Sequence, residues 1–275
     1  MEKVIITAAL TGAVTPKESN PTIPLTPQEI ADEAYACWKA GAAVVHIHMR
    51  DENGIGTMDK GRFKEAAKLI SGKCDVVINM TTSGETGASD DRRMAHLIEL
   101  EPEIASYDAG TFNWTPYIFV NSPPFLEKLG AVMQEHNIKP EVEVFDSGML
   151  HNALHYVKQG VLKAPLHVQF CLGVLGASTA RVEDLVFLKS QLPKDATWSA
   201  FGVGKDHLPI LYAAIAMGGH VRVGLEDNIY YAKNTLASNV DLVSRAARLV
   251  REANKEVAKP EEARRILGLK GYKKF

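Results

Sequence analysis

Residues 26–48 read TPQEIADEAYACWKAGAAVVHIH, and the fold can be worked out from this stretch. Thr26 predicts a helix N-cap, with Pro27 at the first helical position and acidic residues in the first turn. Gly41 predicts the end of that helix, and the apolar run Ala43–His48 that follows is typical of a buried strand. A helix followed directly by a buried strand is the repeating unit of an α/β protein.

The same alternation of apolar runs and amphipathic stretches extends over the whole chain. The short runs are apolar almost throughout, which is typical of parallel strands covered by helices on one face and packed inside on the other. A helix candidate follows each run, and eight such units favour a closed (β/α)8 TIM barrel over a doubly wound sheet. The predicted strands are Val4–Thr7, Ala43–His48, Val76–Met80, Ile104–Tyr107, Glu141–Phe145, Leu166–Cys171, Thr197–Phe201 and His220–Val223.

The length of 275 residues agrees with one barrel, because a (β/α)8 domain typically takes about 250 residues. No linker rich in Pro, Gly or Ser divides the chain, so we expect a single barrel domain over residues 1–275 with a C-terminal tail at about 258–275. The lysines of that tail predict a solvated end. After the helix that begins at Thr26, the predicted helices are Lys60–Ile70, Asp91–Leu100, Pro123–His136, Ser147–Lys158, Val182–Gln191, Leu208–Met217 and Asn234–Asn254.

Composition excludes several classes of protein. The chain is 46% hydrophobic and 23% charged, which excludes collagen, coiled coil and disorder. With 31 basic and 33 acidic residues the net charge is −2, so no global field attracts nucleic acid or an anionic membrane. No apolar run reaches the roughly 18 residues of a membrane span. Cys37, Cys74 and Cys171 form neither a disulfide framework nor a thiolate metal site, and we expect buried, reduced thiols in a cytoplasmic protein.

Catalytic groups of a (β/α)8 barrel gather at the C-terminal ends of its strands. The second predicted strand carries His46 and His48 at that end, and residues two apart on a strand point the same way. Two imidazoles directed at one point are able to hold a metal ion, and catalytic Zn²⁺ takes about three protein ligands, often two His and a carboxylate. A His-x-His pair also occurs by chance, so a third ligand is needed to decide.

The best candidates for that ligand follow the eighth predicted strand. In a closed barrel this strand returns beside the first, so Glu226 and Asp227 are able to reach the same mouth as the histidine pair. One carboxylate would bind the metal and the other would act as a base. Arg222, beside Asp227, is expected to lower the pKa of that carboxylate and keep it ionised. His220 begins its strand at the wrong end for the site.

Small polar groups at other strand ends suit an anion. Thr81 and Thr82 follow the third predicted strand, and Ser106 lies in the fourth. Hydroxyls and backbone N–H groups in such loops suit a carboxylate or a phosphate. Glu141 and Glu143 alternate in the fifth strand and therefore face one side. Acids that point into a barrel are costly without partners, which favours a role for Glu143 in the site.

With these motifs in place, the sequence resembles the β-keto acid cleavage enzymes, the family that contains 3-keto-5-aminohexanoate cleavage enzyme. The resemblance implies a (β/α)8 barrel with a zinc ion, usually assembled as a homotetramer. It covers nearly the whole chain through several long motifs in order. These motifs are Thr7–Ala13, Val45–Arg50, Pro140–Val144, Gly218–Arg222 and Glu226–Asn228.

The resemblance also implies a role for each candidate residue. The zinc ligands fall on His46, His48 and Glu226. The general base falls on Asp227, paired with Arg222 and supported by Glu143. The site for the substrate carboxylate falls on Thr81, Thr82 and Ser106.

The activity that the resemblance implies is an exchange in which a β-keto acid and acetyl-CoA yield acetoacetate and a new acyl-CoA. The chemistry of the residues agrees with it. A carbon acid between a ketone and a carboxylate is too weak for an aspartate base unless the developing enolate is stabilised, which Zn²⁺ does as a Lewis acid. Two neutral imidazoles and one carboxylate leave the metal with a residual positive charge that suits an anionic substrate.

One position departs from the family's pattern. Members that act on the amino substrate carry a glutamate able to hold its ammonium group, where this sequence has Val14. An apolar side chain does not pair with a buried cation. We therefore expect 3-keto-5-aminohexanoate to be a poor substrate and a neutral or apolar β-keto acid to be preferred, with Val14 lining its tail.

Two other functions stay open at this point. A metal-dependent hydrolase of the amidohydrolase type is also a barrel with a His-x-His strand, but that architecture expects the pair on the first strand and further metal histidines on later ones. The obvious later candidate, His167, lies early in its strand. A catalytically silent barrel that binds a partner would require the histidine pair, Glu226 and Asp227 to be incidental.

Overall fold

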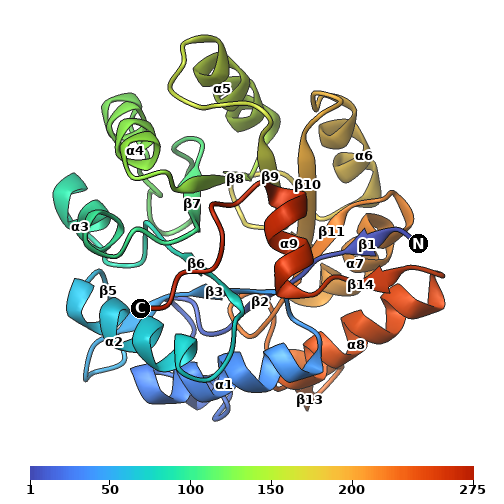
Figure 1. Ribbon diagram of the computed structural model, residues 1–275. Coiled ribbons are helices and arrows are strands. Elements are labelled where there is room, and N and C mark those ends of the chain that lie inside the picture. The colour runs from blue at the N-terminus through green and yellow to red at the C-terminus, as the bar shows by residue number, and fades with distance from the viewer.

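Eight parallel strands close into a barrel, and helices surround it (Figure 1). The structure is a computed structural model that describes residues 1–275. The expected (β/α)8 TIM barrel is thereby confirmed. The barrel strands are β2 (Ile6–Ala9), β3 (Val44–Ile47), β6 (Val77–Met80), β7 (Ile104–Asp108), β8 (Lys139–Val144), β9 (His167–Leu172), β10 (Thr197–Gly202) and β11 (His220–Val223). Around the ring they run β10-β11-β2-β3-β6-β7-β8-β9, so β11 lies beside β2 and β2 beside β3.

The first long helix begins where its capping residue predicts. Thr26 and Glu29 form a capping box, in which each side chain accepts a hydrogen bond from the backbone N–H of the other residue. The α-helices are α1 (Pro27–Ala40), α2 (Lys60–Ser71), α3 (Asp90–Leu100), α4 (Pro123–Glu135), α5 (Ser147–Lys158), α6 (Val182–Ser190), α7 (His207–Ala216), α8 (Asn239–Glu252) and α9 (Pro260–Leu267), with short 3₁₀ helices η1 (Lys17–Ser19) and η2 (Gly204–Asp206). None of them has the length and hydropathy that crossing a membrane requires.

The predicted start of the last long helix, at Asn234, is wrong. Asn234 has a φ of 61° and lies in the turn between two short antiparallel strands, β12 (Tyr230–Ala232) and β13 (Thr235–Leu236). Helix α8 begins after Ser238, whose hydroxyl accepts from the N–H of Asp241. Other short strand pairs also have no clear sequence signal. They are β1 (Lys3–Val4) with β14 (Glu256–Val257), and β4 (Met49–Arg50) with β5 (Gly56–Thr57).

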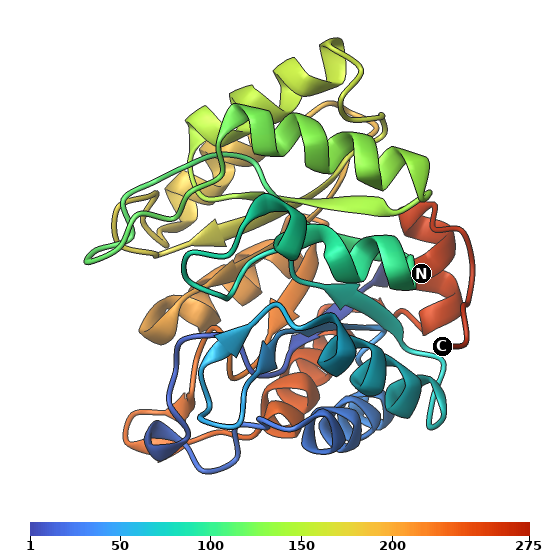
Figure 2. The ribbon, with the colours of Figure 1, turned by 90° about the vertical axis from the view of Figure 1, so that its left-hand side faces the viewer.

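The C-terminal segment closes one end of the barrel. Figure 1 shows α9 in front of the ring of strands, and Figure 2 shows it at the same end as both chain termini. Arg264 of α9 donates two hydrogen bonds to the Glu103 carboxylate, at 2.6 and 2.9 Å, and Leu267 packs in a small apolar cluster with Val44 and Val77. The expected solvated tail is therefore a packed helix over part of its length. The N-terminal ends of the strands are covered, which leaves the opposite mouth for chemistry.

Candidate active site

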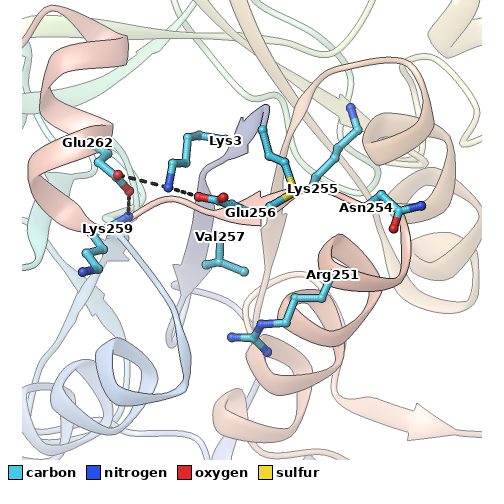
Figure 3. Close-up of a pocket in the computed structure, with 9 residues that line it drawn as sticks. Lys3, Arg251, Asn254, Lys255, Glu256, Val257, Lys259 and Glu262 are labelled. Atoms are coloured by element: carbon cyan, nitrogen blue, oxygen red, sulfur yellow. Dashed lines mark hydrogen bonds and ion pairs between the residues drawn. The ribbon is translucent and has the colours of Figure 1, made fainter.

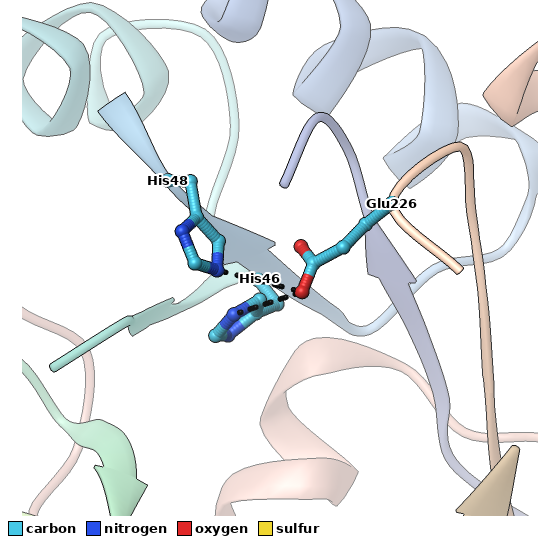
Figure 4. Close-up of side chains that lie close together, drawn as sticks. All are labelled: His46, His48 and Glu226. Atoms are coloured by element: carbon cyan, nitrogen blue, oxygen red, sulfur yellow. Dashed lines mark ion pairs between the residues drawn. The ribbon is translucent and has the colours of Figure 1, made fainter. Parts of the chain in front are cut away.

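Two histidines and a glutamate meet at the C-terminal mouth of the barrel. His46 lies in β3 and His48 directly after it, so both side chains point to the same side. Their Nε2 atoms lie 3.7 and 3.4 Å from Oε1 of Glu226, which comes from the loop after β11 (Figure 4). Ligand atoms of the three residues lie within 4.8 Å of one another. The structure therefore brings together the three residues expected to hold zinc.

The geometry of this group fits a zinc ion. With Zn–ligand distances of about 2.0–2.1 Å, two ligand atoms of a tetrahedral site lie about 3.3–3.4 Å apart, close to the separations of the Nε2 and Oε1 atoms. Burial lowers the pKa of His46 to about 4, so its imidazole is neutral and able to ligate. Oε2 of Glu226 is buried and has no hydrogen-bond partner. A buried carboxylate oxygen without a partner is costly, and a cation would offset that cost.

A second group, His46 with Glu141 and Glu143, also brings ligand atoms within 4.8 Å of one another. Its carboxylates already have partners: Glu141 accepts from Asn79 and lies 3.5 Å from Nε2 of His167, and Glu143 faces an arginine described below. Glu226 is therefore the better third ligand.

Glycines bring the Glu226 loop against the N-terminal strand. Gly224 has a φ of 152°, and a Cβ atom there would lie 2.0 Å from the carbonyl oxygen of Ala9. A Cβ atom on Gly12 would lie 2.8 Å from Cγ of Glu226. Only glycine fits these close approaches, so the two glycines let the carboxylate reach the histidines across β2.

Arg222 of β11 joins the metal candidates to the candidate base. Its Nε and Nη2 each donate to one carboxylate oxygen of Asp227 at 2.9 Å, and Nη2 also donates to Oε1 of Glu226 at 2.6 Å. Nη1 lies 3.7 Å from Oε1 of Glu143, and the guanidinium rests on the Phe201 ring, 4.5 Å from its centroid. A bidentate arginine holds a carboxylate in one orientation, as placement of a base requires.

Arg222 is only one of two influences on the pKa of Asp227. Burial raises the pKa of Asp227 to about 6, and the attraction of Arg222 opposes but does not cancel that rise. Arg222 thus lowers the pKa of Asp227 as expected, but the net pKa is raised because burial, which the sequence did not reveal, has the larger effect. Burial alone would raise the pKa of Glu226, but Arg222 and the two histidines bring it well below its usual range.

Glu143 lies beside a carboxylate that the sequence did not assign. It is buried opposite Asp108, its neighbour in the β7–β8 register. Burial and the Asp108 carboxylate raise the pKa of Glu143 well above its usual range. Burial also raises the pKa of Asp108, whose Oδ2 has no partner. Asp108 follows Ser106 by two positions on the strand, and this spacing was the signal that both face the mouth.

The hydroxyl groups of Thr81, Thr82 and Ser106 differ in whether their protons are already donated within the chain. The Thr82 hydroxyl donates to the Ser106 carbonyl at 3.1 Å, and the Thr81 hydroxyl donates to the Ser83 carbonyl at 3.1 Å. The Ser106 hydroxyl accepts from the Thr82 N–H at 3.1 Å, and no group of the chain accepts its own proton. Of the three hydroxyls, Ser106 is therefore the one whose proton is free to be donated to a ligand.

Val14 lies on the loop after β2 and is 68% exposed. Arg50, which the sequence reasoning did not single out, organises that loop. Its guanidinium is buried and donates to the carbonyls of Thr11, Gly12 and Thr15 at 2.8 to 3.1 Å. Arg50 therefore fixes the backbone of the loop that carries Val14 and packs against Glu226.

A surface hollow of about 570 Å³ lies at the other end of the barrel (Figure 3). Lys3 in this hollow pairs with Glu256 and with Glu262, whose carboxylate lies 3.1 Å from the ammonium group. These ion pairs join the N-terminal strand to the C-terminal segment. The hollow is remote from the strand ends where a barrel places catalytic groups, so it is not the candidate active site.

The comparison with known families agrees with this geometry. A family model described as beta-keto acid cleavage enzyme matches residues 3–269. The chain belongs to this family. The resemblance carried by the sequence motifs is thereby confirmed, and the chain is an enzyme of β-keto acid cleavage rather than an amidohydrolase or a silent binding barrel.

Individual β-keto acid cleavage enzymes match along almost their whole length. The 3-keto-5-aminohexanoate cleavage enzyme of Fusobacterium nucleatum is 46% identical over 273 residues, which covers 98% of this chain and 99% of that relative. The 3-oxoadipate:acetyl-CoA acetyltransferase of Cupriavidus necator is 35% identical over 270 residues, which covers 96% of this chain and 94% of that relative. The family thus includes proteins named for different keto acids.

A solved structure supports the fold of this family member. The apo structure of ObcA superposes with a TM-score of 0.82 at 20% identity, over 90% of this chain and 66% of that chain. At this identity the likeness concerns the barrel alone.

Proposed function

We propose that this protein is a zinc-dependent β-keto acid cleavage enzyme that uses acetyl-CoA as its second substrate. A β-keto acid R–CO–CH₂–COO⁻ and acetyl-CoA would yield acetoacetate and R–CO–CoA. The observation that carries the proposal is the meeting of His46, His48 and Glu226 beside the Arg222–Asp227 pair, in the barrel of a family named for this cleavage. The acetyl-CoA in the name of the Cupriavidus necator relative supports the choice of second substrate.

His46, His48 and Glu226 would hold the zinc ion. When bound there, zinc supplies Lewis-acid polarisation of the substrate's keto group. Arg222 keeps Glu226 ionised by donating to the same oxygen that faces the histidines. The third ligand, Glu226, is therefore already deprotonated and does not have to release a proton when the metal binds.

Asp227 would act as the base that removes a proton from the carbon between the keto and carboxylate groups. With a pKa of about 6 it is mostly ionised at neutral pH, and its conjugate acid is strong enough to return the proton later. The two bonds from Arg222 hold the carboxylate in one orientation throughout. The resulting carbanion would attack the thioester carbonyl of acetyl-CoA, after which transfer of CoA to the former keto carbon and cleavage of the carbon–carbon bond release acetoacetate.

The Ser106 hydroxyl would recognise the substrate carboxylate. Its proton is uncommitted, and the Thr82 N–H fixes the orientation of its lone pairs. Thr81 and Thr82 would shape this carboxylate site through the bonds that their own hydroxyls make to neighbouring carbonyls.

For the rest of the substrate we propose a neutral or apolar chain, with Val14 beside it, rather than the 5-amino group. The relative with 46% identity is named for the amino substrate, so overall similarity and this one position favour different substrates. The apolar side chain at position 14 supports the neutral class, because it does not pair with an ammonium group.

We also propose one barrel domain per chain, a homotetramer and a cytoplasmic location. The family resemblance supports the tetramer, and three buried, unpaired cysteines support a reducing compartment. Mass measurement of the purified protein in solution tests the tetramer.

A panel of β-keto acids with acetyl-CoA tests the proposed function. The purified protein is incubated with 3-oxohexanoate, 3-oxoadipate or 3-keto-5-aminohexanoate, and both acetoacetate and the new acyl-CoA are measured. We expect both products with at least one acid, in equal amounts and only with acetyl-CoA present. Acid consumption without acetyl-CoA would instead support a hydrolase, and inactivity on the whole panel would count against the proposal.

A further inference from the structure

Two side chains of α3 form hydrogen bonds to two consecutive backbone carbonyl groups in the loop after β6. Helix α3 lies outside the barrel on the side of β6 and β7 (Figure 1). Nε2 of His96 lies 2.9 Å from the carbonyl oxygen of Thr81, and Nε of Arg93 donates to the carbonyl of Thr82 at 2.7 Å. Arg93 and His96 are three positions apart and thus neighbours on one helix face.

The contact of His96 is a hydrogen bond from a neutral ring. Burial lowers the pKa of His96 to about 4, so at neutral pH the imidazole carries one proton. The ring is fully buried and stacks on Phe63, with centroids 4.2 Å apart. Because a carbonyl oxygen only accepts, the proton is on Nε2, which donates to Thr81.

These two bonds determine what the loop offers to a bound anion. A carbonyl oxygen directed at a carboxylate would repel it, but both carbonyls here are turned toward α3. A peptide unit directs its C=O and N–H to opposite sides, and the Thr82 N–H meets Ser106 Oγ at 3.1 Å. The bond from His96 thus aims the N–H that holds the hydroxyl proposed to bind the substrate.

Arg93 also reaches the loop after β7. Its Nη1 donates to the Val120 carbonyl at 3.0 Å and its Nη2 to Oδ1 of Asn121 at 2.6 Å. Asn121 is buried and in turn donates to the Gly110 carbonyl at 3.1 Å. The guanidinium rests on the face of Phe125, 3.8 Å from the ring centroid. One side chain therefore ties together the two strand-end loops that flank Ser106.

We infer that Arg93 and His96 are positioning residues for recognition of the substrate carboxylate, acting through the Thr81–Thr82 backbone and Ser106. This inference rests on the proposed function. Arg93 is the stronger member, because its rigid fork makes three directed bonds to two loops, which the ammonium group of a lysine does not reproduce.

Steady-state kinetics of Arg93→Lys and His96→Asn test the inference. The matched control is Arg264→Lys, an arginine that also donates to three acceptor atoms, but at the closed end of the barrel. We expect Arg93→Lys to raise KM for the β-keto acid about tenfold, the effect of one lost hydrogen bond of about 1.4 kcal/mol, with KM for acetyl-CoA unchanged within about twofold. Arg264→Lys should lower the melting temperature and leave both KM values unchanged.

Two further measurements separate positioning from simple loss of stability. The affinity of Arg93→Lys for acetoacetate, measured without acetyl-CoA, should fall by about the same factor as its KM for the β-keto acid rises. Millimolar guanidinium should partly restore the affinity of Arg93→Ala for acetoacetate. If the ratio of KM for the β-keto acid to KM for acetyl-CoA were the same in Arg93→Lys and in the wild type, the inference would be overturned and the proposed function would stay intact. A wild-type protein that neither turns over a β-keto acid nor binds acetoacetate would overturn both.

Discussion

Arg222 holds Asp227 through both carboxylate oxygens, with Nε and Nη2 each 2.9 Å from one of them. The same Nη2 reaches Glu226 at 2.6 Å, so one guanidinium orders the candidate base and the candidate metal ligand together. The pair is buried, where the fixed orientation of a charged group has its largest effect on a reacting molecule.

Asp227→Asn should abolish turnover while zinc stays bound. The amide keeps the size of the carboxylate but does not accept a proton at neutral pH, and loss of a general base costs about 10²–10⁴ in rate. The measurements are kcat and zinc content of the same preparation. Unchanged kcat would move the role of base to another residue, with Glu143 as the next candidate.

His46→Ala and His48→Ala should each lose the bound metal. The wild-type protein is expected to contain roughly one zinc per chain, because two neutral imidazoles and one carboxylate are a complete ligand set for a catalytic site. Elemental analysis after dialysis measures this, with the exposed His151→Ala as the control that keeps its zinc. Full activity of a metal-free wild-type chain would contradict the proposed mechanism.

Ser106→Ala should raise KM for the β-keto acid about tenfold, because it removes the uncommitted hydroxyl proton. Thr81→Ser should have a much smaller effect, since serine keeps the hydroxyl that bonds to Ser83. KM values for the β-keto acid and for acetyl-CoA are compared in both variants. An equal rise in KM for the β-keto acid in the two variants would show that Ser106 has no special part in binding.

Val14→Glu should increase kcat/KM for 3-keto-5-aminohexanoate relative to 3-oxohexanoate. The residue is exposed, so a carboxylate there costs little stability and offers a partner to the ammonium group. The ratio of the two kcat/KM values is measured in both proteins. Equal turnover of the two acids by the wild-type enzyme would show that Val14 does not exclude the amino substrate.

Stability should fall as the pH drops below about 6.5, in part because of His220. Burial, together with His167 and Lys255, lowers the pKa of His220 from 6.5 to about 3. Between these values the unfolded chain binds a proton that the folded chain does not, which costs up to about 1.4 kcal/mol per pH unit. His220→Asn, which keeps an acceptor for the Ile5 N–H, should flatten the dependence of unfolding free energy on pH. The exposed His151→Asn should leave the slope unchanged, and equal slopes in all three proteins would refute the assignment.

Much of the fold could be predicted because its signals are local. The strand His220–Val223 and the helix Ser147–Lys158 have the predicted bounds, and most other elements differ by one to three residues. The start of α8 could not be predicted, because the positive φ of Asn234 belongs to a hairpin whose strands pair through tertiary context. The packing of Arg264 against Glu103 joins distant parts of the chain and has no local pattern.

The candidate site could be predicted in its residue types but only partly in its chemistry. Histidines and carboxylates at strand ends were visible as motifs. The raised pKa of Asp227 was not, because burial depends on what packs around the group. The uncommitted proton of Ser106 and the bonds from Arg93 follow from hydrogen bonds between loops that no spacing encodes.

The sequence by itself determined the order of strands and helices, the closed barrel and the candidate metal ligands, because periodicity, capping and residue chemistry act over a few neighbouring positions. Only the tertiary structure decided that Glu226 stands within 3.4 Å of His48, that the far end of the barrel is covered, and which hydroxyl is free to bind. Distances between side chains and the cost of burying charge depend on barrel closure, which places strands distant in sequence next to one another.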